Sequence, residues 1–170
     1  MDPIIFSIVC GLASIIYGII ASKSILASDA GSKKMQEISN AIQEGANAYL
    51  NRQYLTISYV GIAIFLLIFY FFSFYVAFGF LLGAVLSGLA GYVGMHISVR
   101  SNVRTASAAS KGLSEGLSIA FRAGSVTGML VVGLALLSIG AYYSFLLYKG
   151  INGRGLIEPL VGLSFGASLI

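Results

Sequence analysis

The chain has 170 residues, of which 58% are hydrophobic and only 9% are charged, which excludes an ordinary soluble domain with its roughly 25% of charged residues. A single cysteine excludes a disulfide scaffold, and a net charge of +4 from ten scattered cations disfavours a nucleic-acid-binding protein. The composition therefore predicts an all-α fold, a polytopic bundle of transmembrane helices.

The first predicted element is a membrane span over residues 3–22. No charge occurs between Asp2 and Lys23, and about twenty residues of helix cross a hydrocarbon layer that is about 30 Å thick. A cleaved signal peptide is the alternative, but it would need a positive charge where Asp2 stands and a shorter apolar core. We therefore expect a retained membrane anchor.

The second and third predicted elements form a helical hairpin. The uncharged stretch from Gln53 to Val99 is too long for one span. It divides into spans over residues 53–74 and 77–99, and the turn between them should lie near residues 73–79.

The last predicted elements are a fourth span and an incomplete fifth. The fourth fits residues 123–148, which lie between Arg122 and Lys149. The fifth begins after Pro159, so that residues 159–170 cover only about half a bilayer. We therefore expect four full spans and the start of a fifth, which together form the N-terminal transmembrane part of a longer protein.

The distribution of lysine and arginine predicts the orientation. Eight of these residues lie in the two connections between spans one and two and spans three and four: Lys23, Lys33, Lys34, Arg52, Arg100, Arg104, Lys111 and Arg122. Only Lys149 and Arg154 lie on the other side. The positive-inside rule then places both basic loops in the cytoplasm and the N-terminus outside. Interfacial tyrosines are expected at the outer surface (Tyr70, Tyr75, Tyr142, Tyr143, Tyr148) and at the inner surface (Tyr49, Tyr54).

Small residues recur every four positions and predict close helix packing. In the third span they are Gly79, Gly83, Ser87 and Gly91. The same spacing occurs in the other spans, in Ser14, Gly18 and Ser22, in Gly124 and Gly128, and in Gly162 and Gly166. We interpret these stripes as packing surfaces, because a permeation site usually adds ionisable groups within the membrane.

The spans carry little that could perform chemistry. No Asp or Glu lies in the first four, and the one histidine, His96, is expected to face headgroups or a loop rather than to act as a pH-sensitive group. One histidine, one cysteine and no acidic cluster do not make a zinc or magnesium site. The glycine-rich segment of residues 150–155 lacks the phosphate-loop spacing and predicts an external turn. No catalytic, cofactor-binding or metal-ligating residue is therefore predicted.

The two basic connections are predicted to be helical. Arg100, Arg104 and Lys111 fall on one face of a helix that continues out of the third span, with Glu115 four residues beyond Lys111. We interpret this face as a solvated, charge-balanced surface, although it could also bind anionic headgroups or steer an anionic substrate. The other connection contains an amphipathic segment that continues into the second span. Its apolar residues lie near one side of the helix: Ile38, Ile42, Ala46, Tyr49 and Leu50. Its charged residues are Glu37, Glu44 and Arg52.

Four segments of the sequence resemble the membrane-bound, ion-translocating pyrophosphatases. They are QEGANAYLNRQY (residues 43–54), GMHISVRSNVRTA (94–106), AFRAGSVTGM (120–129) and GLSFGASLI (162–170). The last resembles the start of the fifth helix of that family, so the resemblance covers nearly the whole chain.

This resemblance implies the N-terminal portion of a homodimeric pump of the bacterial inner membrane. Such a pump hydrolyses Mg²⁺-pyrophosphate at the cytoplasmic face and translocates H⁺ or Na⁺ outward. The catalytic and Mg²⁺-binding motifs of the family begin beyond Ile170, so the chain alone is expected to be inactive. The resemblance assigns no role to Glu44, Arg100, Arg104 or Arg122, and it implies neither H⁺ over Na⁺ nor a K⁺ requirement.

Two other interpretations fit parts of the sequence. A small non-enzymatic membrane subunit for packing or assembly would have equally charge-poor spans, but it should not stop within a fifth span. A complete secondary transporter would need polar sites at the membrane midplane and a repeated half, and the sequence has neither.

Overall fold

The computed structural model describes residues 2–169, which form five helices and no strand. The helices are α1 (Pro3–Leu26), α2 (Lys33–Phe71), α3 (Phe74–Ala109), α4 (Leu113–Tyr148) and α5 (Arg154–Ala167). Within these residues four helices, α1 to α4, are long and apolar enough to cross a membrane. The predicted all-α, polytopic bundle is therefore confirmed. Ile170, the last residue of the predicted fifth span, lies outside the described residues.

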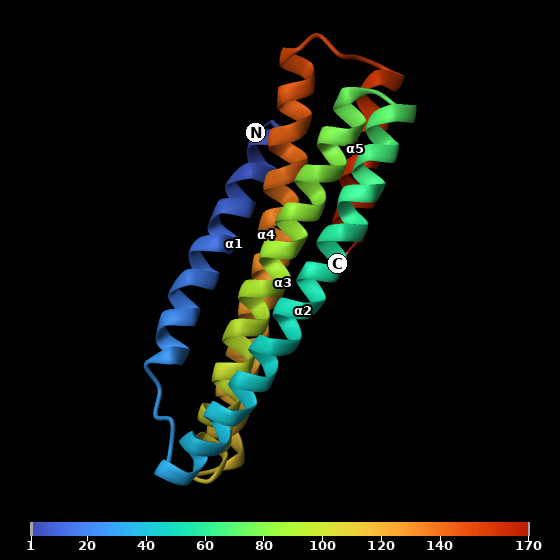
Figure 1. Cartoon of the computed structure of the whole chain (residues 1–170). Coiled ribbons are helices and arrows are strands. Elements are labelled where there is room, and N and C mark those ends of the chain that lie inside the picture. Colours follow the sequence, from blue (N-terminus) through green and yellow to red (C-terminus); the bar gives the residue numbers. More distant parts are fainter. Residues whose placement is uncertain (1, 170) are drawn as a thin grey trace.

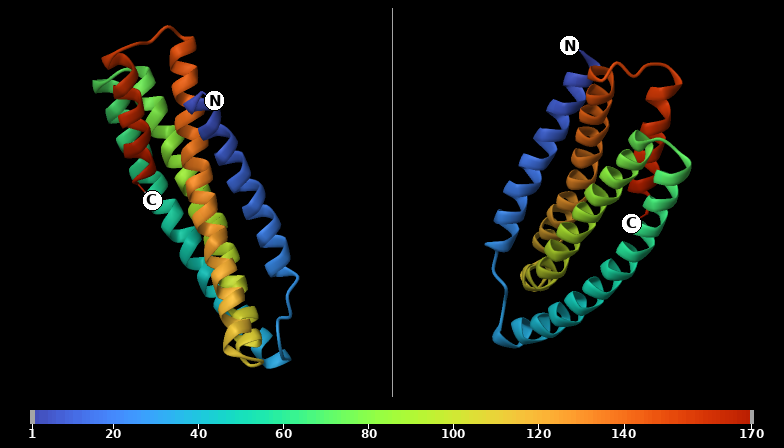
Figure 2. Two further views of the ribbon diagram at one scale, coloured as in Figure 1. Left: turned by 180° about the vertical axis from the view of Figure 1, so that it is seen from behind. Right: turned by 45° about the horizontal axis from the view of Figure 1, so that its top comes forward.

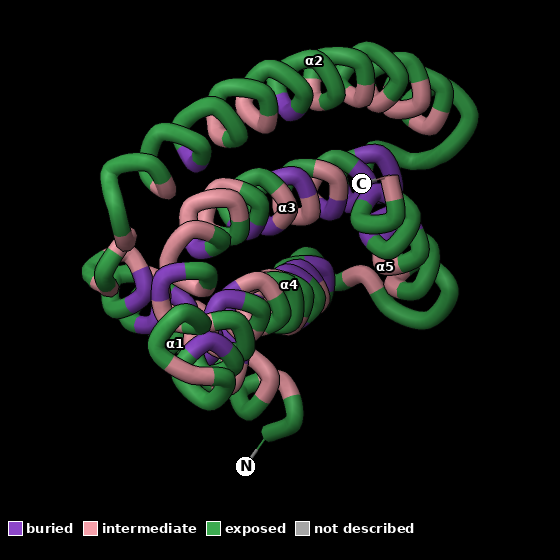
Figure 3. Tube along the Cα trace, turned by 90° about the horizontal axis from the view of Figure 1, so that it is seen from below, coloured by how far each residue is buried: buried purple, intermediate pink, exposed green. Residues whose placement is uncertain are grey.

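The long helices pack side by side in the order α2, α3, α4, α1, and α5 lies against α3 (Figures 1 and 2). The N-terminus, the α2–α3 turn and the α4–α5 connection lie at one end of the bundle. The α1–α2 loop and the α3–α4 turn lie at the other end, which we call the basic end because eight of the ten cations lie in these connections or on the parts of the helices that lead to them. α3 contacts every other helix, whereas α3 is the only one of the five described helices that α2 packs against; Leu169, which follows α5, also reaches Gly61 of α2. The outer face of α2 is accordingly exposed along its length (Figure 3).

Three helices are much longer than a membrane is thick. α2 has 39 residues, and α3 and α4 have 36 each, so each measures more than about 50 Å against about 30 Å of hydrocarbon. The expected continuation of the third helix beyond its span is confirmed, since α3 runs unbroken to Ala109. The amphipathic run after Lys33 likewise continues into the second span as one helix.

Two helix starts differ from the sequence-based expectation. The turn expected over residues 73–79 is confined to Phe72 and Ser73, because the Ser73 hydroxyl accepts a hydrogen bond from the Val76 amide at 3.3 Å and so caps α3. The fifth helix begins at Arg154 and not after Pro159. Gly153, with φ +61°, reverses the chain there, and Pro159 is accommodated inside the helix although it has no N–H to donate to the preceding turn.

Glycines bring α3 and α5 into backbone contact. A Cβ atom at Gly83 would collide with the carbonyl oxygen of Leu163, and one at Gly166 would collide with that of Phe80. A Cβ atom at Gly79 or Gly162 would likewise collide with a backbone carbonyl oxygen of the facing helix. The packing predicted for these four glycines is confirmed.

The corresponding prediction for α4 is not met among the described residues. Gly124 and Gly128 are exposed, and no heavy atom of the described chain lies within 4 Å of a Cβ built on either. α4 presents Ala123 and Val126 to α1 instead, which turns the two glycines away. Further along α4, Gly133 takes up the close contact with α1.

Tyr142 is not an interfacial tyrosine, as the sequence had suggested. Its side chain is 2% exposed, and its hydroxyl donates to the Tyr75 carbonyl oxygen of α3 at 2.5 Å. It packs with Leu146 and Leu163 between α4 and α5. Tyr70 and Tyr148, by contrast, are 80% and 86% exposed at the same end of the bundle.

Candidate functional site at the basic end

Polar side chains that are distant in sequence meet at the basic end, where α1 ends and α3 turns into α4. The α1–α2 loop is shaped by the Asp29 carboxylate, which accepts a hydrogen bond from the Gly31 amide at 2.9 Å. Gly31 has φ +75°, a backbone conformation that glycine adopts without strain. Ser32 then caps α2 by accepting from the Met35 amide. This tight turn directs the Asp29 side chain towards the end of α3.

Asp29 connects the loop to the end of α3. Its carboxylate lies 3.0 Å from the Lys111 ammonium and accepts a hydrogen bond from the Ser107 hydroxyl at 3.1 Å. The Gly31 amide, followed by Lys111 and Ser107, lowers the pKa of Asp29 from 3.8 to about 2. The carboxylate therefore stays ionised at any physiological pH, and it pairs with Lys111 at a position where both side chains are more than half exposed.

Arg104 holds the end of α1. One guanidinium nitrogen donates to the Leu26 carbonyl oxygen at 2.8 Å, and another donates to the Arg100 carbonyl oxygen at 2.6 Å. Leu26 is the last residue of α1, where carbonyl groups have no partner within the helix and a positive charge is favourable. The Arg104 Nε atom is buried and has no hydrogen-bond partner among the described residues. Arg104 of α3 thus bonds to a residue of α1 that lies 78 positions earlier in the sequence.

α1 and α4 share a second set of polar contacts nearby. The Arg122 guanidinium donates to the Ser24 hydroxyl, and the hydroxyls of Tyr17 and Ser125 lie 2.9 Å apart. Together with Arg104 and Asp29, these contacts tie the last turns of α1 and the following loop to both α3 and α4.

The cluster borders a hollow of about 330 Å³. Asp29 and Glu115 contribute two acidic groups to its wall, and Arg104 and Lys111 contribute two basic groups. Within residues 2–169 no three His, Cys, Asp or Glu side chains come together as metal ligands. At this hollow Asp29 is paired with Lys111, and the positive charges of Lys111 and Arg104 disfavour a bound magnesium ion. The contacts of Asp29, Lys111 and Arg104 can instead hold the α1–α2 loop and the α3–α4 turn in a fixed geometry.

The charged face predicted from the sequence is divided by the structure. α3 ends at Ala109, so Lys111 lies in the turn and pairs with Asp29, while Glu115 belongs to the first turn of α4. The expectation of one continuous face through Glu115 is wrong for this reason. Arg100 lies higher on α3 and donates to the His96 carbonyl oxygen at 3.2 Å.

The remaining candidates lie apart from this cluster. Glu44 and Arg52 are exposed on α2, and the His96 ring lies 4.4 Å from the Tyr92 ring on α3. Residues 149–153 form the connection between α4 and α5 at the opposite end, with positive φ at Gly150 and Gly153, so the turn predicted over residues 150–155 is present, although its last two residues already belong to α5.

Sequence reasoning missed Asp29 and Ser107. The signal for Asp29 was present in the order Asp29, Gly31, Ser32, which is typical of an Asx turn followed by a helix cap. Nothing in the sequence relates this turn to Ser107 or Lys111, because that contact depends on how the helices pack.

Comparison with known proteins gives matches over almost the whole chain. The family described as inorganic H⁺ pyrophosphatase matches residues 12–170. The chain is 50% identical to the K⁺-insensitive pyrophosphate-energized proton pump of Methanosarcina mazei, over 100% of this chain and 25% of that protein. It is 36% identical to the protein of the same name from Pyrobaculum aerophilum, over 98% of this chain and 24% of that protein. A Moorella thermoacetica protein named K⁺-insensitive pyrophosphate-energized proton pump 2 is 37% identical, over 94% of this chain and 24% of its own length. The chain thus spans about a quarter of the length of these relatives.

Proposed function

Because the chain belongs to the inorganic H⁺ pyrophosphatase family, we propose that it is the N-terminal transmembrane part of a pump that hydrolyses Mg²⁺-pyrophosphate and moves protons across the membrane. The observation that carries this proposal is the 50% identity to a named proton pump over the whole chain. The names of the relatives favour H⁺ over Na⁺ and independence from K⁺. A homodimer in the inner membrane, which the sequence resemblance implies, belongs to the same proposal.

Within such a pump we assign the described residues a supporting role. The glycines of α3 hold α5 in place, and the contacts of Arg104 and Asp29 fix α1 and its loop. The hollow beside Asp29, where Arg104 and Lys111 accompany the two carboxylates, is poorly suited to Mg²⁺. Catalytic, metal-binding and ion-translocating residues would then lie in the part of the relatives that this chain does not match.

The test is pyrophosphate-driven transport by the full-length protein. Inverted membrane vesicles that contain it should release phosphate from pyrophosphate in the presence of Mg²⁺, without added K⁺, and should acidify inside. Removing Mg²⁺ with a chelator should abolish both signals, because the metal neutralises the diphosphate for attack by water. Residues 1–170 expressed alone should release no phosphate.

Two results would contradict the proposal. Sodium loading without acidification would refute H⁺ as the transported ion. Hydrolysis by residues 1–170 alone would refute the supporting role of this part of the chain.

The orientation of the bundle is also a proposal, with the basic end in the cytoplasm. In a cysteine-free full-length protein, Asn152→Cys in the α4–α5 connection should react with an impermeant maleimide on intact cells. Ser114→Cys, which is exposed at the basic end, should react only after lysis. The physical reason is that eight of ten cations lie on the side of Ser114. Labelling of Ser114→Cys on intact cells would reverse the orientation.

A further inference from the structure

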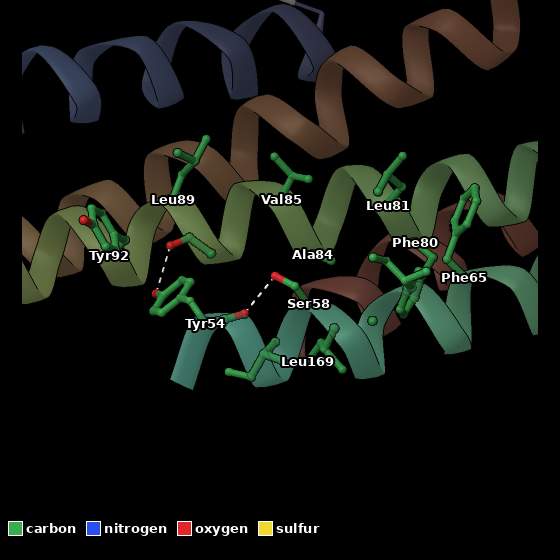
Figure 4. A pocket seen from close by; sticks show the side chains of 14 residues that line it. Tyr54, Ser58, Phe65, Phe80, Leu81, Ala84, Val85, Leu89, Tyr92 and Leu169 are labelled. Carbon is green, nitrogen blue, oxygen red and sulfur yellow. Dashed lines mark hydrogen bonds between the residues drawn. The ribbon is translucent and has the colours of Figure 1, made fainter. Parts of the chain in front are cut away.

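We draw no further inference here: the strongest candidate, the open apolar groove of about 450 Å³ between α2 and α3 (Figure 4), lies beside Leu169 and is lined by no charged side chain among the described residues, so nothing in the structure shows what covers it.

Discussion

Replacing Gly83 with leucine is expected to destabilise the full-length protein by about 3 kcal/mol or more. A Cβ atom at Gly83 would collide with the carbonyl oxygen of Leu163, and it would lie 2.8 Å from the amide nitrogen of Ala167. Both obstacles are backbone atoms of α5, so no side-chain rotation can relieve the overlap. The two helices must separate, which also breaks the contacts of Gly79 and Gly166, and such overpacking costs more than the usual 1–3 kcal/mol of a tight core.

The matched control is Gly128→Leu in α4, where a Cβ meets no atom of the described chain within 4 Å. Both substitutions replace a helical glycine, so both gain the same helix propensity. The measurement is the midpoint of thermal unfolding in detergent, together with the yield of monodisperse protein. If Gly83→Leu lowers neither quantity more than Gly128→Leu does, the contact between α3 and α5 is not as close as described.

Replacing Arg104 with methionine should cost about 2 kcal/mol, the range expected for hydrogen bonds to a charged group. Methionine keeps an apolar stem of similar length but cannot donate to the Leu26 carbonyl oxygen. The end of α1 then loses its bond to α3, and we expect faster amide hydrogen exchange in residues 24–32. Hydrogen exchange followed by mass spectrometry measures this local loosening separately from global stability.

Arg100→Met serves as the control for this prediction. Arg100 also donates to a carbonyl oxygen, but this oxygen belongs to His96 of the same helix. Its loss should leave exchange in residues 24–32 unchanged, with an effect on stability within about 0.5 kcal/mol. Equal exchange in the two variants would show that Arg104 does not anchor α1.

The sequence predicts the helices well because membrane spans are a local property. An uncharged stretch such as the one from Gln53 to Val99 must lie in hydrocarbon whatever surrounds it, and its length then requires a hairpin. The face that each helix turns towards its neighbours is not local. Gly128 carries the same small-residue spacing as Gly83, yet within residues 2–169 Gly83 meets another helix and Gly128 does not.

The contacts among the polar groups at the basic end could not be predicted from the sequence for the same reason. The positively charged groups, Arg104 and Lys111, could be listed from the sequence, but their partners lie 78 and 82 residues away. Every residue has a backbone carbonyl oxygen, so the sequence does not distinguish that of Leu26 as a hydrogen-bond partner. Only the packing of α1 beside α4 and α3 brings these groups together.

The order in which the helices neighbour one another has a consequence for biosynthesis. α1 and α2 are consecutive in the chain but do not touch among the described residues, and α1 packs mainly against α4. Gly11 meets Gly133 and Leu137, which a ribosome adds more than a hundred residues later. At roughly 5–20 residues per second, the first helix must wait on the order of ten seconds for its partner. During that interval its exposed glycine face can be shielded only by lipid or by the membrane insertion machinery.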